Sequence, residues 1–488
     1  MKKITIPAFI LILTVSIIIT AYAENEDITP GKPYNITNNY AQDSSAGFVV
    51  QWHDKTGISK QLLQIVKVNE SFDNAKSIAV TGFNFDVTGI TECPSYNGNC
   101  NNPECSGIGN YEKRNIFRAE VTGLSANTKY KYRVGAPLSW SETYFHLTSS
   151  AAAADFSFTV VTDTQDSVFS AMRRTLNSAN AYDSDNRFFI HAGDVVDYIG
   201  LRETEIENYT KAAAGFNRTR PVAATQGNHD TYHNKTGDQY VFGEASVFNA
   251  YTVFPNNGFV RTESNYDKNR SDSYYFYYNR VLIVMLNTFA TSNETGTREP
   301  DHYDQEQWFR NILQKDKNEN LSDFRIVVSH IPPFAGRGSS NNNEPWLMEP
   351  VRRIFAPICT EFKVDIFFAG HDHVYGRSNP IIIKEDKTSL AEIEKNNPGK
   401  GVFGPTEGGT IYTIAASTGP KTYVFRNPSG TTNQFIPKYF PVRFDEDDFR
   451  PGLFINVKVS SGKMIVTAMI AEDDLTSTVL DTYEVIKK

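Results

Sequence analysis

The sequence predicts an α/β domain of layered sheets, preceded by a smaller all-β sandwich. Residues 27–148 contain short alternating runs such as AGFVVQWHD and KYKYRVGAP, separated by turn signals, which is typical of a β-sandwich. From residue 155 to 488, β-rich runs alternate with amphipathic helical stretches, which indicates layered α/β sheets. The small-residue stretch SSAAAAD at 149–155 separates these two periods. Strand-like runs return from about residue 410, and we expect them to complete a second sheet of the same domain.

The first 23 residues read as a signal peptide. Two lysines precede an apolar, uncharged stretch, which ends in the cleavage pattern Ala21-Tyr22-Ala23. The alternative is an uncleaved anchor, since the apolar stretch is about long enough to span a bilayer. The A-x-A ending favours cleavage, so we expect a secreted or otherwise extracytoplasmic protein with no membrane contact after cleavage.

Within the predicted sandwich, two aromatic positions suggest specific structural roles. Trp52 lies on an alternating run and is expected to pack between the sheets. Either Tyr130 or Tyr132 could form the tyrosine corner found in such sandwiches.

Cysteine and asparagine patterns bear on export. Cys93, Cys100 and Cys105 crowd one loop, where we expect one disulfide whose pairing the sequence leaves open. Cys359 is expected to be a buried free thiol. Eight Asn-x-Ser/Thr sequons are candidate glycosylation sites if the host glycosylates. They are Asn35, Asn69, Asn208, Asn217, Asn234, Asn269, Asn293 and Asn320.

Five short segments place polar side chains directly after apolar, β-rich runs of the predicted α/β domain. Side chains at the carboxyl ends of buried strands point into the crevice where open α/β sheets bind ligands. Asp, Asn and His arriving there from five strands supply the oxygen and nitrogen ligands that a pair of divalent metals requires. The segments are Asp163–Gln165, Gly193–Asp197, Gly227–Asp230, Ser329–His330 and Gly370–His373.

Together and in this order, the five segments resemble those of the calcineurin-like metallophosphoesterases, a superfamily with a four-layer α/β/β/α sandwich. With a fibronectin III-like sandwich in front, nearly all of the mature chain is similar to the purple acid phosphatases. The stretches NTKYKYRVG, WSETYFHL and GTIYTIAASTGPK also look like that family.

The resemblance implies a ligand set and a mechanism. The first metal would be held by Asp163, Gln165, Asp194 and His373, and the second by Asp194, Asn228, His330 and His371, with Asp194 bridging. A hydroxide between the metals would attack phosphorus in line with the leaving oxygen. His229 is the expected transition-state stabiliser or proton donor, and Asp197 or Asp230 could orient it.

Two departures from the family pattern concern the metals. The first motif ends in Gln165 where the family usually has His, so the first metal should be held by a neutral, harder oxygen ligand. Asp197 occupies the position where purple enzymes place a ligating Tyr, and Tyr198 comes one residue later. We therefore do not expect a tyrosinate-bound Fe(III), and an Fe, Mn or Zn pair stays open.

Other residues near the motifs are candidate substrate contacts. Tyr198, Tyr232, His233 and Arg337 fall in the adjoining loops. His191 could line the site or be a hydrogen-bonded core histidine. His53, His146 and His302 are expected to be structural or solvent-facing.

These patterns predict an exported dinuclear-metal phosphoesterase that hydrolyses phosphomonoesters. A small phosphorylated substrate is the expected partner, and the formal net charge of −8 argues against nucleic-acid binding. Two alternatives are a phosphodiesterase or nucleotide pyrophosphatase on the same site, and a non-catalytic binding protein with a decayed site.

Overall fold

The computed structural model describes most of the chain in separate ranges. They are residues 32–55, 60–85, 112–197, 199, 203–230, 233–236, 239–242, 246–258, 273–288, 299–334, 345–384, 390–392, 402–403, 409–423, 440–444 and 451–487. The predicted signal peptide and the cysteine-rich loop lie outside these ranges. Among the helices described, none is both long and apolar enough to cross a membrane.

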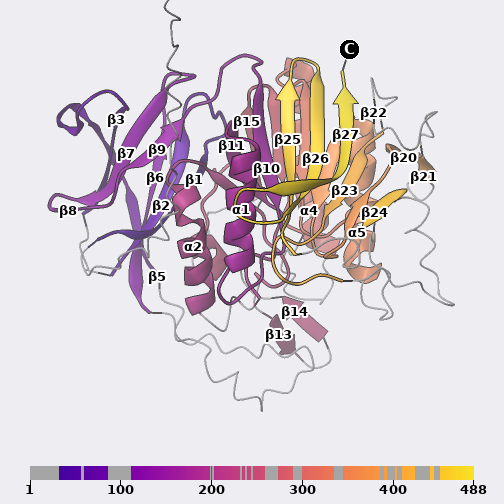
Figure 1. Cartoon of the computed structure of the whole chain (residues 1–488), viewed down its shortest axis with the longest axis horizontal. Helices are drawn as coiled ribbons and strands as arrows, with labels where there is room; N and C mark the ends of the chain where they lie inside the picture. The colour runs from indigo at the N-terminus through magenta and orange to yellow at the C-terminus, as the bar shows by residue number, and fades with distance from the viewer. Residues whose placement is uncertain are drawn as a thin grey trace, which may run out of the picture.

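The N-terminal part is an all-β sandwich of two antiparallel sheets (Figure 1). One sheet has the order β1 (Tyr34–Tyr40), β2 (Phe48–Asp54), β6 (Arg114–Val121) and β5 (Thr81–Phe85). The other has the order β4 (Lys76–Ala79), β3 (Leu62–Lys67), β7 (Lys129–Ala136) and β8 (Ser139–Trp140), with β9 (Tyr144–Leu147) also paired to β7. The 3-10 turn η1 (Phe72–Asn74) follows β3.

Buried and more exposed residues alternate along β3, β6 and β7, whereas nearly every residue of β1 and β2 is buried. Trp52 is fully buried and stacks on Phe117, as expected for a side chain between the sheets. The hydroxyl of Tyr130 accepts a hydrogen bond of 2.9 Å from the backbone N–H of Ser125, so Tyr130 rather than Tyr132 forms the corner.

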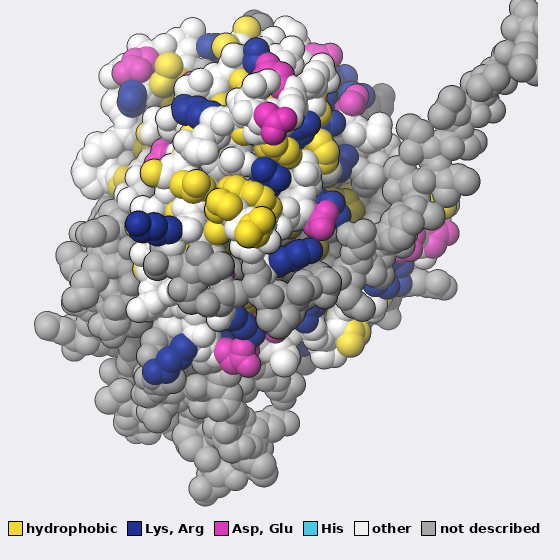
Figure 2. Space-filling model, turned by 90° about the vertical axis from the view of Figure 1, so that its left-hand side faces the viewer, with side chains coloured by type: hydrophobic (Ala, Val, Ile, Leu, Met, Phe, Trp, Pro, Cys, Tyr) yellow, Lys and Arg dark blue, Asp and Glu magenta, His cyan; other side chains and the backbone are white. Residues whose placement is uncertain are grey.

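The outer face of this sandwich, turned to the viewer in Figure 2, mixes apolar side chains with Lys and Arg. On β7, the guanidinium of Arg133 lies 4.4 Å from the ring centroid of Phe72 and 4.6 Å from that of Trp140. Gln64 accepts hydrogen bonds from the same guanidinium, so Arg133 is held by its own sheet.

The larger part contains two mixed seven-stranded sheets packed face to face, with helices on both outer sides (Figure 1). The first sheet has the order β12 (Val222–Ala224), β11 (Asn186–His191), β10 (Phe156–Val161), β25 (Leu453–Ser460), β26 (Lys463–Ala471), β27 (Ser477–Ile486) and β22 (Val402–Phe403). The second has the order β15 (Tyr274–Tyr278), β16 (Val281–Met285), β17 (Phe324–Val328), β18 (Ile366–Ala369), β23 (Ile411–Ala415), β19 (Tyr375–Arg377) and β24 (Val442–Phe444).

Helices α1 (Ser170–Tyr182) and α2 (Glu203–Asn217) cover the first sheet. Helices α4 (Glu299–Glu319) and α5 (Pro345–Glu361) cover the second, and the buried free thiol of Cys359 lies in their core. The expected four-layer α/β/β/α arrangement is confirmed. The remaining described elements are β13 (His233–Thr236), β14 (Gln239–Phe242), α3 (Ser246–Tyr251), β20 (Ile381–Ile383) and β21 (Leu390–Glu392).

The C-terminal strands differ from the sequence-based expectation. They were expected to complete the second sheet, but β25, β26 and β27 extend the first sheet and only β23 and β24 join the second. The reason is that β10 pairs in parallel with β11 on one side and antiparallel with β25 on the other, so the last strands complete the sheet at β10. The stretch 376–410 contains the short strands β20, β21 and β22.

A buried polar and aromatic interface joins the two parts. The fully buried side chain of Arg114 on β6 is ion-paired with Glu203 of α2, lies 3.6 Å from Glu207, and donates a 3.1 Å hydrogen bond to the hydroxyl of Tyr251. Tyr40 of β1 packs against three aromatic rings of the larger part, namely Phe188, Phe276 and Tyr278.

Candidate metal centre

Five strand ends meet where the two sheets face each other, and each supplies part of one cluster. Asp163 and Gln165 follow β10, Asp194 follows β11, and Asn228 follows β12. From the second sheet, His330 follows β17, and His371 and His373 follow β18. The strands are parallel within β10–β12 and within β16–β18, so their carboxyl ends meet at one edge of each sheet.

The predicted ligands form two groups with one shared member. In one group, ligand atoms of Asp163, Asp194 and His373 lie within 4.8 Å of one another. In the other, the same holds for Asp194, His330 and His371. Asp194 is therefore the only residue common to both groups, as a bridging carboxylate must be.

Asn228 belongs to the second group. Its Oδ1 lies 3.1 Å from Nε2 of His330 and 3.0 Å from Nδ1 of His371. An amide oxygen between two imidazole nitrogens completes a set of one carboxylate, one carbonyl and two imidazole ligands, which suits a divalent transition metal.

Gln165 provides the test of whether a metal fits the first group. Its Nε2 donates a 3.0 Å hydrogen bond to Oδ2 of Asp194, which fixes the orientation of the amide. Its Oε1 is buried and has no hydrogen-bond partner in the described part of the chain. A buried carbonyl oxygen without a partner is costly, and a cation held by Asp163, Asp194 and His373 would satisfy it. The residues present therefore fit a cation.

The tautomers of two histidine ligands are set by backbone carbonyls. Nδ1 of His330 lies 2.8 Å from the carbonyl oxygen of Ala192, and Nδ1 of His373 lies 2.8 Å from that of Lys421. A carbonyl only accepts, so Nδ1 carries the proton in both rings and Nε2 offers its lone pair to the cluster.

The backbone is strained at the cluster. Asp163, Asp194, His371 and His373 have φ angles of 50°, 53°, 71° and 53°, in the left-handed region that non-glycine residues rarely adopt. The glycines of the motifs allow close approach, because a Cβ at Gly227 would collide with Asp194 and one at Gly370 would collide with Thr162 and Asp163. Both features hold ligand side chains together at the expense of local stability.

For Asp194 and His330, the effect of neighbouring charges on the pKa is larger than the opposing effect of burial. Burial opposes ionisation of Asp194, yet His330 and His229 hold its pKa well below its usual range. Burial likewise opposes protonation of His330, but Asp194 raises its pKa to about 9. His371 differs, since burial and the neighbouring His330 lower its pKa to about 3.

His229 and Asp197 are brought together as predicted, while Asp230 is used differently. Nδ1 of His229 donates to the backbone carbonyl of Asp197 at 2.6 Å and lies 3.6 Å from its carboxylate. The carboxylate of Asp230 instead accepts hydrogen bonds from the backbone N–H groups of Val195, Val196 and Gly227. Asp230 therefore organises the two loops, and burial raises its pKa to about 7.

Lys421 is a site residue that the sequence analysis missed. Its ammonium is ion-paired with the carboxylate of Asp197, and the ring of Tyr423 lies 4.6 Å from that of His373. The stretch GTIYTIAASTGPK pointed to the family, but nothing in its pattern placed its last residue at the metal cluster.

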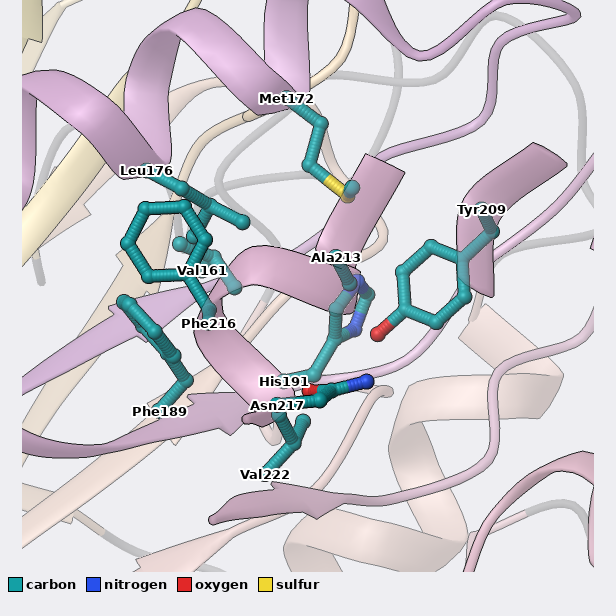
Figure 3. Close-up of a pocket in the computed structure, with 10 residues that line it drawn as sticks. All are labelled: Val161, Met172, Leu176, Phe189, His191, Tyr209, Ala213, Phe216, Asn217 and Val222. Atoms are coloured by element: carbon teal, nitrogen blue, oxygen red, sulfur yellow. The ribbon is translucent and has the colours of Figure 1, made fainter. Parts of the chain in front are cut away.

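Five further residues were candidates near the motifs. Tyr198, Tyr232 and Arg337 fall outside the described residues, and His233 begins β13 without a described side chain. His191 is a core histidine: Nε2 lies 3.0 Å from Oγ1 of Thr164, and the ring borders a small apolar cavity beneath α1 and α2 (Figure 3). Its burial lowers its pKa to about 4.

Family models match both parts of the chain. Residues 33–148 match the model described as Purple acid Phosphatase, N-terminal domain, and residues 156–375 match Calcineurin-like phosphoesterase. Among curated proteins, Purple acid phosphatase 21 of Arabidopsis thaliana is 26% identical over 56% of this chain and 56% of its own length. A purple acid phosphatase of Glycine max is 23% identical over 56% of this chain and 54% of its own length. These alignments span about half the length of the relatives.

Solved structures share the fold. A purple acid phosphatase from yellow lupin (Lupinus luteus) seeds superposes with a TM-score of 0.71 at 15% identity, covering 94% of this chain and 75% of that one. The structure of PhoD superposes with a TM-score of 0.58 at 12% identity, covering 94% and 91%.

Proposed function

We propose that this chain, a calcineurin-like phosphoesterase with a purple acid phosphatase N-terminal domain, is a dinuclear-metal hydrolase of phosphomonoesters. The observation that supports this most directly is the pair of ligand groups sharing Asp194. One carboxylate common to two groups of buried ligands is the arrangement that a two-metal site needs.

When bound, two cations would activate a water as the nucleophile and neutralise charge on the phosphate oxygens. Asp163, Gln165, Asp194 and His373 would hold one cation, and Asp194 with the three ligands Asn228, His330 and His371 would hold the other. The orphaned Oε1 of Gln165 makes the first position rich in oxygen ligands, which favours a hard cation such as Mn or Fe there. The second position, with two imidazoles, suits Zn, Fe or Mn.

The chain's own residues would supply the proton. Nδ1–H of His229 is held by the carbonyl of Asp197, so the acid–base chemistry of this ring takes place at Nε2. From there, His229 would donate a proton to the leaving oxygen as the ester bond breaks. Its side chain is 21% exposed, whereas that of His330 is fully buried, so an incoming substrate can reach His229 but not His330.

Export belongs to the same proposal. Residues 1–23 have the features of a cleaved signal peptide, so the mature enzyme would begin at Glu24 and act on a small phosphorylated substrate outside the cytoplasm. Of the described sequons, Asn69 and Asn320 are exposed, whereas Asn35 and Asn217 are buried. If the host glycosylates, Asn69 and Asn320 would carry glycans, and the two buried sites would not.

The test begins with residues 24–488, purified and analysed for bound metals. We expect about two metals per chain and faster hydrolysis of p-nitrophenyl phosphate than of bis-p-nitrophenyl phosphate. Faster hydrolysis of the diester would replace the monoesterase proposal with a phosphodiesterase. Absence of both metal and turnover after supplying Mn, Zn and Fe would contradict the proposal and favour a binding protein.

A further inference from the structure

Three polar side chains lie on a solvent-exposed side of the metal cluster. The side chains of Lys421, Asp197 and His229 are 35%, 27% and 21% exposed. The ligand carboxylates of Asp163 and Asp194 behind them are 0% and 2% exposed. A phosphate that approaches the cluster from the side of these three groups therefore meets them before it reaches the two carboxylates.

Lys421 is held in place by the cluster itself. Its backbone carbonyl accepts the hydrogen bond from Nδ1 of His373. The preceding turn is tied to the first motif, because the N–H groups of Thr418 and Gly419 donate to the carbonyls of Thr162 and Asp163 at 2.9 and 3.0 Å. The backbone of Lys421 is thus held in place, and its side chain extends to the carboxylate of Asp197.

The negative charge of Asp197 would repel an anionic substrate, and the ammonium of Lys421 neutralises this charge. The carboxylate lies 3.6 Å from Nδ1 of His229 and its side chain is 27% exposed, so an anionic substrate that reaches His229 comes close to this negative charge. An unpaired carboxylate there would repel a phosphomonoester dianion about twice as strongly as a diester monoanion, since Coulomb energy scales with the product of the charges. The ion pair with Lys421 cancels this repulsion.

We propose that Lys421 is a specificity-determining residue, whose ammonium neutralises Asp197 and contacts a terminal phosphate oxygen, thereby selecting dianionic monoesters over monoanionic diesters. The inference rests on the proposed phosphatase function and names the substrate class of that site. Three rotatable N–H donors let one ammonium serve Asp197 and a phosphate oxygen together.

The experiment compares Lys421→Met, Lys421→Arg and the double variant Asp197→Asn/Lys421→Met in the metal-loaded mature chain. Lys458→Met, which alters an exposed lysine of β25, is the matched control. For each, KM and kcat are measured with p-nitrophenyl phosphate and with bis-p-nitrophenyl phosphate. Binding of inorganic phosphate is measured by calorimetry, which does not depend on turnover.

Lys421→Met should raise KM for the monoester and the Kd for phosphate by roughly tenfold, while changing kcat/KM for the diester less than about threefold. Lys421→Arg should restore much of the loss, and the double variant should recover part of it because the repelling carboxylate is gone. The Lys458→Met control should match the wild type.

Equal losses on both substrates would overturn the inference in favour of a purely structural ion pair, as would unchanged phosphate binding in Lys421→Met. If the wild type binds two metals and phosphate but hydrolyses neither ester, the proposed function fails. The phosphate affinities still decide the role of Lys421 in that case. If Lys421→Met does not fold, the phosphate affinity of Lys421→Gln decides the question.

Discussion

Gln165 donates a 3.0 Å hydrogen bond from Nε2 to Oδ2 of Asp194, and this contact leaves its own Oε1 buried without a partner. The amide is thereby oriented by the carboxylate that both ligand groups share. The orientation of Gln165, the predicted ligand that departs from the family pattern, therefore depends on Asp194, the predicted bridging ligand.

The first prediction concerns the oxygen of Gln165. The substitution Gln165→Leu removes this oxygen and should raise the Kd of the metal at the first position by about tenfold or more, because a neutral ligand is lost. Gln165→His should strengthen binding, since imidazole is the better donor to a transition metal. Calorimetric titration with Mn and Zn measures both effects, and identical affinities in all three proteins would contradict a ligand role for Gln165.

The second prediction separates the shared ligand from an unshared one. Asp194→Ala should lose both metals and lower kcat/KM more than about a hundredfold, because both groups need its carboxylate. His373→Ala should lose chiefly the metal of the first group. Elemental analysis of the purified variants checks the stoichiometry, and two retained metals in Asp194→Ala would disprove the bridging role.

The third prediction concerns pH and His146, a buried residue whose two ring nitrogens both lack a hydrogen-bond partner in the described part of the chain. Burial lowers its pKa to about 3, whereas the unfolded chain should titrate near the ordinary value of 6.5. Between these values the unfolded state binds the extra proton, so stability is lost as pH falls from about 6.5 towards about 3, by up to about 1.4 kcal/mol per pH unit.

His146→Phe should remove this acid-dependent loss, because the ring stacked on Phe48 stays apolar and cannot titrate. Urea denaturation at several pH values measures the slope for both proteins. An unchanged slope in the variant would assign the acid sensitivity to other groups.

The fourth prediction addresses the interface between the two parts. Arg114→Met should destabilise the protein by about 3 to 5 kcal/mol, because it leaves the largely buried carboxylates of Glu203 and Glu207 without the fully buried cation that neutralises them. Arg280→Met is the control, since it removes a solvent-exposed pair with Asp323 and should cost less than about 1 kcal/mol. Equal effects on the midpoint of thermal unfolding would show that the Arg114 pair contributes little.

The residues predicted as metal ligands lie close together in the structure, and the sequence could indicate this because their signal is local. Each ligand follows a continuous apolar strand, and the carboxyl ends of such strands converge by the geometry of the sheets. Asp230 shows the limit of that reasoning: it adjoins His229 in sequence, but its carboxylate is used by three backbone N–H groups of the neighbouring loops.

Features that depend on distant partners escaped the sequence reasoning. Strand β1 was missed because its residues Asn38 and Asn39 are polar although they are buried. Their side-chain amides donate hydrogen bonds to the carbonyls of Asn217 and Val253 across the interface. Lys421 was missed because its partner Asp197 lies 224 positions away. Periodicity reports how one segment faces its surroundings and carries no information about which distant residue it meets.

The pairing of β10 with β25 has a consequence for the newly made chain. The strand that delivers Asp163 and Gln165 gains its second neighbour only when residues 453–460 have been synthesised. A product that ends before residue 453 lacks β25, and one edge of β10 is then left unpaired. The first motif therefore has neighbouring strands on both sides only when residues 156–161, 186–191 and 453–460, which lie far apart along the chain, have come together in one sheet.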